Sequence, residues 1–96
     1  MRKTASMDSA VVAAEDQVFS DIGGEVAILD LKGGTYYGLD AVGVRIWNLV
    51  QRPRKIVEVR DELLAEYEVD AKRCERDLLD FISALESEGL VEVTHP

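Results

Sequence analysis

The stretch ILDLKGGTYYGLDAVGVRIWNLV, residues 28–50, joins a strand pattern directly to a helix pattern. Apolar residues alternate up to the glycine pair 33–34, and residues 35–39, TYYGL, are rich in β-formers. Asp40 then stands where a helix N-cap would accept hydrogen bonds from the first free amides. The residues after it place apolar side chains on one helical stripe, with the only tryptophan, Trp47, on its flank: Val42, Ile46, Leu49 and Val50. The stretch therefore predicts an edge strand that runs into an amphipathic helix.

Two more strands are predicted upstream of this stretch. Residues 15–22, EDQVFSDI, indicate a strand that ends at the glycine pair 23–24, and residues 25–31, EVAILDL, indicate a second strand. Apolar side chains occupy both alternating sets of this second strand, which is typical of a strand covered on both faces. Glycine tolerates the positive φ of tight turns, so the three strands are expected to form an antiparallel β-meander with residues 35–39 at one edge.

Two more helices are predicted downstream. Pro53 is expected to end the first helix, because proline lacks an N–H and disfavours a helical conformation at the residue before it. A second helix is expected to begin near Arg54, although its start, RPRK, lacks a Ser, Thr or Asp cap. Its apolar residues recur at helical spacing: Ile56, Val59, Leu63 and Tyr67.

The third helix is predicted to be the longest and carries signals at both ends. Asp70 is placed to cap its start, and Gly89 followed by Leu90 is typical of a C′ glycine with a hydrophobic C″ residue. Its inward stripe is expected to consist of Cys74, Leu78, Phe81, Ile82 and Leu85. Residues 91–93, VEV, either pair as a short strand or simply pack against the helix, and the pattern leaves both open.

The elements therefore run three strands and then three helices, with the second and third helices joined in the manner of a helix-turn-helix. This order predicts the α+β class and a winged-helix-like fold, a three-stranded antiparallel β-meander followed by three α-helices. Residues 1–14 are small and polar with weak periodicity, so they are expected to form a flexible N-terminal arm. The folded domain is expected to span residues 15–93.

Composition narrows the classes of function. The 96-residue chain carries 19 acidic and 11 basic side chains, and its net charge of -8 repels phosphate backbones. Cys74 is the only cysteine, so no internal disulfide can form, and a buried helical thiol in a reducing cytoplasm is expected. Acids interrupt residues 1–16 before a signal-peptide core can form, and no apolar run is long enough to span a membrane. The protein is expected to be cytoplasmic, with neither nucleic acid nor membrane as partner.

No catalytic constellation is apparent in the sequence. The sole histidine, His95, is the penultimate residue, and no serine or cysteine has an evident base, so no enzymatic activity is expected. The acids are scattered as on solvated helix faces, which predicts no metal site. Neither glycine pair opens a helix after a strand, as a phosphate-binding loop would, and no cofactor is expected.

A helix-turn-helix could instead bind DNA through its third helix. The basic residues of that helix alternate with acidic ones, which cancels any basic face: Lys72, Arg73 and Arg76 against Glu75, Asp77 and Asp80. A winged-helix DNA-binding protein is therefore a weaker interpretation than an interaction module.

The edge strand at residues 35–39 is the most informative feature for binding. Edge strands expose unpaired N–H and C=O groups and are usually blunted by charge or proline, and TYYGL contains neither. Such a strand can accept an extended peptide by β-augmentation, or pair with a second copy as in an antitoxin-like oligomer. The side chains of Tyr36 and Tyr37 alone fit ordinary strand packing as well as a binding role.

Two stretches together resemble the PqqD-like family: residues 28–50, quoted above, and residues 62–91, ELLAEYEVDAKRCERDLLDFISALESEGLV. The resemblance covers about residues 15–93. It is carried by three motifs in a fixed order, GxYYGLD, VxxRIW and LxxxGLV, which are moderately specific together and weak singly.

The resemblance implies a RiPP recognition element, a small winged-helix-like domain that binds the leader of a ribosomally made precursor peptide and presents it to modifying enzymes. In such families the leader adds as a strand to the third strand of the meander and lies against the third helix. Carried onto this sequence, the implied peptide-binding residues are Thr35, Tyr36, Tyr37, Gly38, Leu39, Arg73, Asp77, Leu78 and Phe81.

A free-standing copy is most similar to the split B protein of lasso peptide biosynthesis. That resemblance implies two protein partners, a separate cysteine-type leader peptidase and an ATP-dependent cyclase. The peptide chaperone of pyrroloquinoline quinone synthesis is the alternative within the family, and no feature inside the domain separates the two. As an adaptor the protein is expected to be monomeric when free, whereas the oligomer interpretation predicts a mass that rises with concentration.

Overall fold

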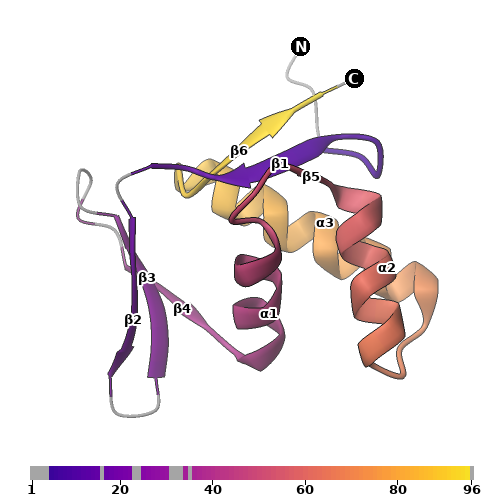
Figure 1. The fold of residues 1–96 in the computed structure, drawn as a ribbon, viewed down its shortest axis with the longest axis horizontal. Coiled ribbons are helices and arrows are strands. Elements are labelled where there is room, and N and C mark those ends of the chain that lie inside the picture. The colour runs from indigo at the N-terminus through magenta and orange to yellow at the C-terminus, as the bar shows by residue number, and fades with distance from the viewer. Residues whose placement is uncertain (1–4, 16, 23–24, 31–33, 35, 96) are drawn as a thin grey trace.

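The computed structural model describes residues 5–15, 17–22, 25–30, 34 and 36–95. One three-stranded antiparallel sheet has the order β2-β3-β4, with β2 at Gln17–Ile22, β3 at Glu25–Asp30 and β4 at Tyr36–Leu39. The helices are α1 at Ala41–Leu49, α2 at Ile56–Glu66 and α3 at Ala71–Ser87. The predicted α+β class, with a β-meander followed by three helices, is confirmed (Figure 1).

A second small sheet ties the start of the described chain to its end. It has the order β5-β1-β6, with β1 at Ala10–Ala13 paired antiparallel to β5 at Arg54–Lys55 and to β6 at Val91–Thr94. The expectation of a flexible arm is wrong for residues 10–13, because β1 has two strand partners and Val11 is only 1% exposed. The open question about residues 91–93 is also answered, since they belong to β6.

The first two helices begin and end at local hydrogen bonds. The Gly43 N–H donates to Asp40 Oδ1 at 2.7 Å, which confirms the predicted cap of α1. This helix already ends at Leu49, before the turn that leads to Pro53, so proline is not its terminator. Residues 54–55 form β5 rather than the first turn of α2. The Lys55 backbone N–H donates to Glu58 Oε1 at 2.9 Å, so the glutamate in the first turn of α2 ties the N-cap residue, Lys55, to the helix.

Both predicted end signals of α3 are confirmed. The Arg73 N–H donates to Asp70 Oδ2 at 3.0 Å at the start of the helix. At its end Gly89 has φ 74°, in the left-handed region that glycine tolerates. The Leu90 N–H donates to Leu85 O at 2.9 Å and the Gly89 N–H donates to Glu86 O at 3.0 Å, which is a Schellman motif. This motif turns the chain directly into β6.

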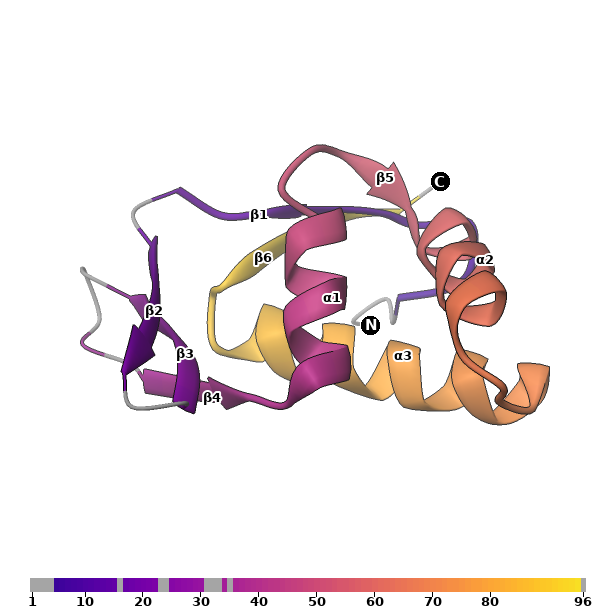
Figure 2. The same ribbon diagram turned by 60° about the horizontal axis from the view of Figure 1, so that its bottom comes forward.

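A single core joins the two sheets and the three helices. In Figures 1 and 2, α1 lies between the β-meander and α2, and α3 runs behind α1 and α2. Ala27 and Ile28 are adjacent in β3 and both buried, so the strand is covered on both faces as predicted. Every helix contributes fully buried or nearly buried side chains to the core, among them Ile46, Trp47, Ile56, Val59, Leu78, Ile82 and Leu85.

Two residues of the predicted helical stripes lie outside this core. Val42, expected on the inward stripe of α1, is 41% exposed, and the buried Gly43 takes the inward position instead. Tyr67, expected to continue the stripe of α2, is the C-cap of that helix and is exposed. Both lie at the end of a helix, where the neighbouring elements no longer cover the stripe.

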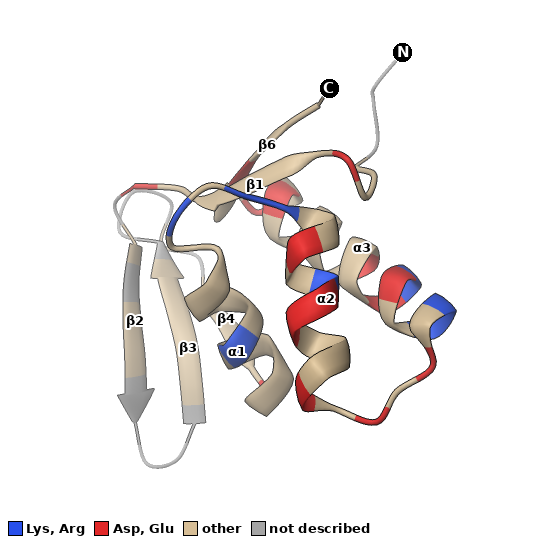
Figure 3. Cartoon of the chain, turned by 45° about the vertical axis from the view of Figure 1, so that its right-hand side comes forward, with Lys and Arg blue, Asp and Glu red and all other residues tan. Residues whose placement is uncertain are grey.

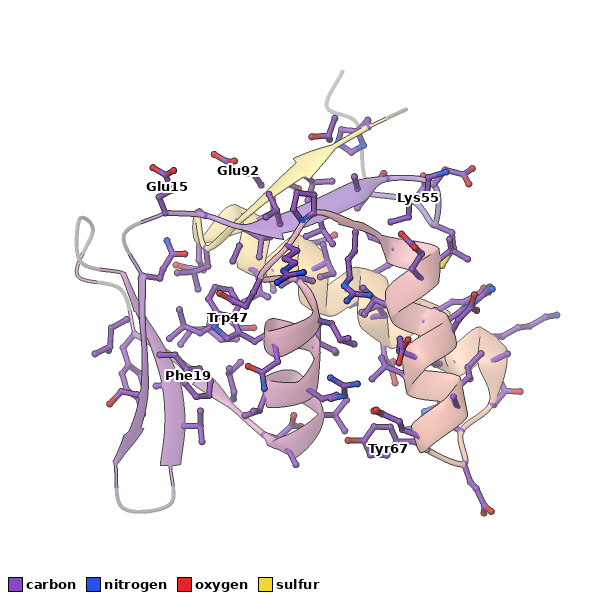
Figure 4. All side chains as sticks on the ribbon, in the orientation of Figure 1. Glu15, Phe19, Trp47, Lys55, Tyr67 and Glu92 are labelled. Carbon is purple, nitrogen blue, oxygen red and sulfur yellow. The ribbon has the colours of Figure 1, made fainter. Side chains whose placement is uncertain are left out.

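We expect Trp47→Ala to lower the free energy of unfolding by about 3 kcal/mol or more, because the residue is 3% exposed and belongs to the core. Figure 4 shows its side chain directed from α1 toward the β-meander. Asn48→Ala is the control, since Asn48 is the exposed neighbour on the same helix and should change stability by no more than about 0.5 kcal/mol. Chemical denaturation of both variants measures the difference, and equal losses would contradict the assigned packing.

Candidate functional site

A cavity with a volume of about 460 Å³ opens beside β4. Residues of β4 and α3 form two of its walls, and the first turns of α1 and the end of α2 form the others. Most of its lining side chains are apolar, with acidic and basic groups at Asp40, Arg73 and Asp77. The cavity is therefore suited to apolar groups of an extended ligand that also meets charge.

The β4 wall is an edge strand. In the order β2-β3-β4, β3 is the strand partner that the described residues provide for β4, so the opposite side of β4 is open. The cross-strand register pairs Tyr37 with Ile28, and Ile28 is fully buried, so Tyr37 shares the inner face of the sheet. Tyr36 lies on the other face and is 59% exposed. The two tyrosines therefore have different environments: Tyr37 is directed into the molecule and Tyr36 toward solvent.

The α3 wall combines aromatic, aliphatic and charged side chains. The rings of Tyr37 and Phe81 meet edge to face, with centroids 6.2 Å apart and planes at 64°, so β4 and α3 are in direct contact at the cavity. Leu78 is buried one turn away on the same helix. Arg73 and Asp77 form an exposed ion pair at the rim, with Nε and Oδ2 3.7 Å apart.

The remaining wall, formed by α1 and the end of α2, was not predicted from the sequence. Val42 of α1, Tyr67 and Val69 are exposed apolar residues, and all three line the cavity. In Figure 4, Tyr67 lies at the end of α2 with its ring directed toward α1. The pattern of α1 and α2 assigns Val42 and Tyr67 to the core, and only the spatial meeting of the two helix ends reveals them as a surface. We call this group, with Leu63, the α1–α2 wall.

The structure brings most of the implied peptide-binding residues to one place. Those that line the cavity are Tyr37, Gly38, Leu39, Arg73, Asp77, Leu78 and Phe81. Tyr36 belongs to the same strand but is exposed on the other face of the sheet and does not line the cavity. Thr35 lies outside the described residues.

A fork-shaped ion pair stands beside the α1–α2 wall. Arg45 Nε donates to Glu66 Oε2 at 2.9 Å and Arg45 Nη2 donates to Glu66 Oε1 at 2.7 Å, and we call this pair the Arg45–Glu66 clasp. The hydrogen bond from Arg45 holds the pKa of Glu66 below its usual value. A lowered pKa means that the clasp is intact at neutral pH and is lost only as the pH falls through that value.

A second arginine, Arg60 of α2, forms an ion pair with Glu75 of α3 and so joins these two helices. Arg60 contacts the carboxylate of Glu75 and also donates to Asp61 Oδ1, with Nη2 and Oδ1 2.9 Å apart. In Figure 3, acidic residues predominate on α2, while basic and acidic residues alternate at the start of α3. Neither helix therefore offers a continuous basic surface.

Cys74 is buried in the cavity wall, as the sequence predicts. Burial raises the pKa of its thiol, so the protonated form dominates at neutral pH and a thiolate nucleophile is disfavoured. Within the described ranges no group of three His, Cys, Asp or Glu side chains is arranged to hold a metal ion. No helix in the described part of the chain is long and apolar enough to cross a membrane.

The fold and the cavity together define a winged-helix-like domain whose edge strand stands open beside an apolar cavity. Residues 25–91 match the family described as Coenzyme PQQ synthesis protein D (PqqD). Because this match spans more than half of the chain, the protein belongs to the PqqD family. The matched segment begins at β3 and contains β4 and the three helices, and so includes every wall of the cavity.

Two solved structures are similar to the chain. The structure of TbiB1 in complex with the TbiA(beta) leader peptide has 44% sequence identity and a TM-score of 0.75, and the match covers 84% of this chain and 94% of that one. Lasso peptide synthetase B1 complexed with the leader peptide has 21% identity and a TM-score of 0.74, with 85% and 96% covered. The second likeness supports the fold alone. No curated protein matches the chain.

The contact between Tyr37 and Phe81 gives a stability test for the two tyrosines. We expect Tyr37→Ala to cost about 2 kcal/mol or more, because it removes an aromatic pair and part of the core. Tyr36→Ala, at the exposed neighbouring position, should cost no more than about 0.5 kcal/mol. Urea unfolding of the two variants measures both values. A larger loss for Tyr36→Ala would mean that the faces of β4 are assigned the wrong way round.

Proposed function

We propose that this protein is a non-catalytic RiPP recognition element of lasso peptide biosynthesis. It binds the leader of a ribosomally synthesised precursor peptide by strand addition to β4. It then delivers the peptide to a separate cysteine-type leader peptidase and to an ATP-dependent cyclase. The observation that carries the proposal is the 44% identity to TbiB1, whose structure holds a leader peptide, over 84% of this chain.

The geometry of the cavity supports this mode of binding. An extended peptide paired to the open side of β4 would direct alternate side chains to the two faces of the sheet. Those on the inner face would meet the apolar side chains of Leu78 and Phe81, and those on the outer face would pass Tyr36. The proposed contact residues are Thr35, Tyr36, Tyr37, Gly38, Leu39, Arg73, Asp77, Leu78 and Phe81.

The role is that of an adaptor because the chain's candidate nucleophile and base are poorly placed for catalysis. The Cys74 thiol is buried with a raised pKa. The His95 ring lies against the fully buried Ser9, with Nδ1 and Oγ 3.3 Å apart, and neither lines the cavity. The proposal assigns this work to the cytoplasm, a reducing compartment that suits a single free thiol.

A second candidate is the peptide chaperone of pyrroloquinoline quinone synthesis, which the description of the matched family favours. Both candidates use a peptide ligand, and they differ in which precursor is bound. A direct competition between the TbiA(beta) leader and the precursor peptide of pyrroloquinoline quinone synthesis separates them. Preference for the quinone precursor would replace the lasso assignment.

The proposal is tested by titrating fluorescently labelled TbiA(beta) leader with the purified protein. We expect saturable binding with a Kd of about 10 μM or lower, and at least about tenfold weaker binding of a scrambled peptide of the same composition. The same titration with random duplex DNA tests the DNA-binding alternative and should show no saturation at moderate salt. Equal affinity for the leader and the scrambled peptide would overturn the proposal.

Proline variants test strand addition directly. Successive residues of a strand direct their N–H and C=O groups to opposite sides, so one of Tyr36 and Tyr37 bonds β3 and the other faces the open side. Tyr36→Pro and Tyr37→Pro should therefore differ, because proline removes a donor. We expect one variant to lose structure by circular dichroism and the other to remain folded and bind the leader at least about tenfold more weakly. Strand addition is ruled out if both fold and bind as tightly as the parent.

A charge reversal tests the α3 wall. We expect Asp77→Lys to weaken leader binding mainly through a slower association rate, with an effect that shrinks as salt is added. Asp80→Lys is the matched control, because Asp80 is exposed on the same helix and does not line the cavity. Stopped-flow measurements at low and high salt give the rates. Indistinguishable effects of the two substitutions would show that this face of α3 does not meet the peptide.

A further inference from the structure

We propose that Arg45 is a positioning residue for the cavity: through the Arg45–Glu66 clasp it fixes the α1–α2 wall in place before a peptide arrives. This inference rests on the proposed function where it concerns peptide affinity. Its structural part concerns the free protein and can be tested without any ligand. Arg45 is the central residue of the VxxRIW motif and does not itself line the cavity.

The clasp lies between cavity-lining residues on both helices. On α1, Arg45 precedes Ile46, which lines the cavity, and follows Val42 by three residues. On α2, Glu66 is the last helical residue and stands directly before Tyr67. Nε and Nη2 of Arg45 reach both carboxylate oxygens of Glu66 at 2.7 to 3.0 Å, and Nη2 is also 3.8 Å from Glu62. A movement of the end of α2 away from α1 would therefore break a two-pronged hydrogen bond.

Leu63 belongs to the core, but the rest of the α1–α2 wall has little else to hold it. Tyr67 and Val69 are 37% and 49% exposed, and residues 66–73 are all exposed. After the last helical bond, from the Tyr67 N–H to Leu63 O at 2.9 Å, the chain to Asp70 has no regular structure. Among the side-chain hydrogen bonds and ion pairs of the described residues, those of Arg45 are the ones that join α1 to α2.

Helix electrostatics favour an arginine at this place. The C-terminus of a helix carries partial negative charge from its free carbonyl groups, and a cation there is stabilising. The last turn of α2 contains no basic residue of its own. Arg45 therefore supplies from α1 the positive charge that α2 lacks. Lysine cannot replace it fully, because a single ammonium group cannot hold both carboxylate oxygens in a planar fork.

Fixing this wall in advance would raise affinity without a direct contact between Arg45 and the peptide. A loose wall must be ordered when a ligand binds, and that ordering subtracts from the binding free energy. With the clasp formed, the apolar side chains of the α1–α2 wall already surround the cavity. Arg45 then acts on the peptide through Glu66 and the end of α2.

The structural part is tested by hydrogen exchange at the Tyr67 amide, measured by NMR in the free protein. We expect Arg45→Met to speed exchange at this amide about tenfold, because local opening of the last turn becomes easier. Arg60→Met is the matched control: it also removes an arginine clamp from α2, but one directed to α3, and should leave the Tyr67 amide within about twofold of the parent. No change at Tyr67 in Arg45→Met would overturn the inference, whatever the peptide results.

The functional part uses the TbiA(beta) leader as probe. We expect Arg45→Met to weaken its binding about tenfold, Arg45→Lys to weaken it less, and Arg60→Met to leave it within about twofold. The double variant that exchanges the two charges, Arg45→Glu with Glu66→Arg, should recover most of the lost affinity. It would not do so if Arg45→Met weakened binding only through a local loss of packing. Failure of the swap to recover affinity that Arg45→Met had lost would overturn the role of Glu66. If the parent itself does not bind the leader, the proposed function fails while the exchange test still decides the clasp.

Discussion

The corner between β4 and α1 is the constraint on which the cavity depends. There the Gly43 N–H donates to Asp40 Oδ1 at 2.7 Å and starts the helix immediately after the strand. The corner is tight: a Cβ on Gly43 would lie 3.2 Å from Asp40 Oδ1 and 3.3 Å from Leu39 Cδ2. Glycine is the residue that fits this close approach without displacing the cap. The GLDAVG segment therefore sets the angle between strand and helix, and with it the distance between two walls.

This corner also explains why an edge strand can remain open. A four-residue strand that continues into a capped helix presents only a short row of free main-chain groups. The inner face of β4 is already covered by α3, because Tyr37 contacts Phe81 of that helix. A net charge of -8 further opposes pairing between two copies of the chain. The strand is thus accessible to a peptide while self-association is discouraged.

Local signals in the sequence predicted the elements well, and long-range contacts account for what was missed. Asp40, Asp70 and Gly89 act within a few residues of their own positions, so their sequence context was enough to place the helix ends. The sheet β5-β1-β6 could not be predicted in the same way, because its strands are short and come from distant parts of the chain. A four-residue apolar run such as AVVA becomes a strand only when its partners are present.

In the candidate site, too, local signals could be predicted from the sequence and long-range contacts could not. Its β4 and α3 walls followed from an uncharged edge strand and from the family resemblance, whereas the α1–α2 wall depends on how two helix ends meet in space. Val42 and Tyr67 have the spacing of core residues, and the sequence cannot show that the core stops before reaching them. Exposed apolar side chains are costly in water. Phe19 and Tyr36 are exposed outside the cavity, but Val42, Tyr67 and Val69 gather around it. A ligand that covers them would remove that cost, so the part of the fold least supported by its own core is the part most suited to gain from binding.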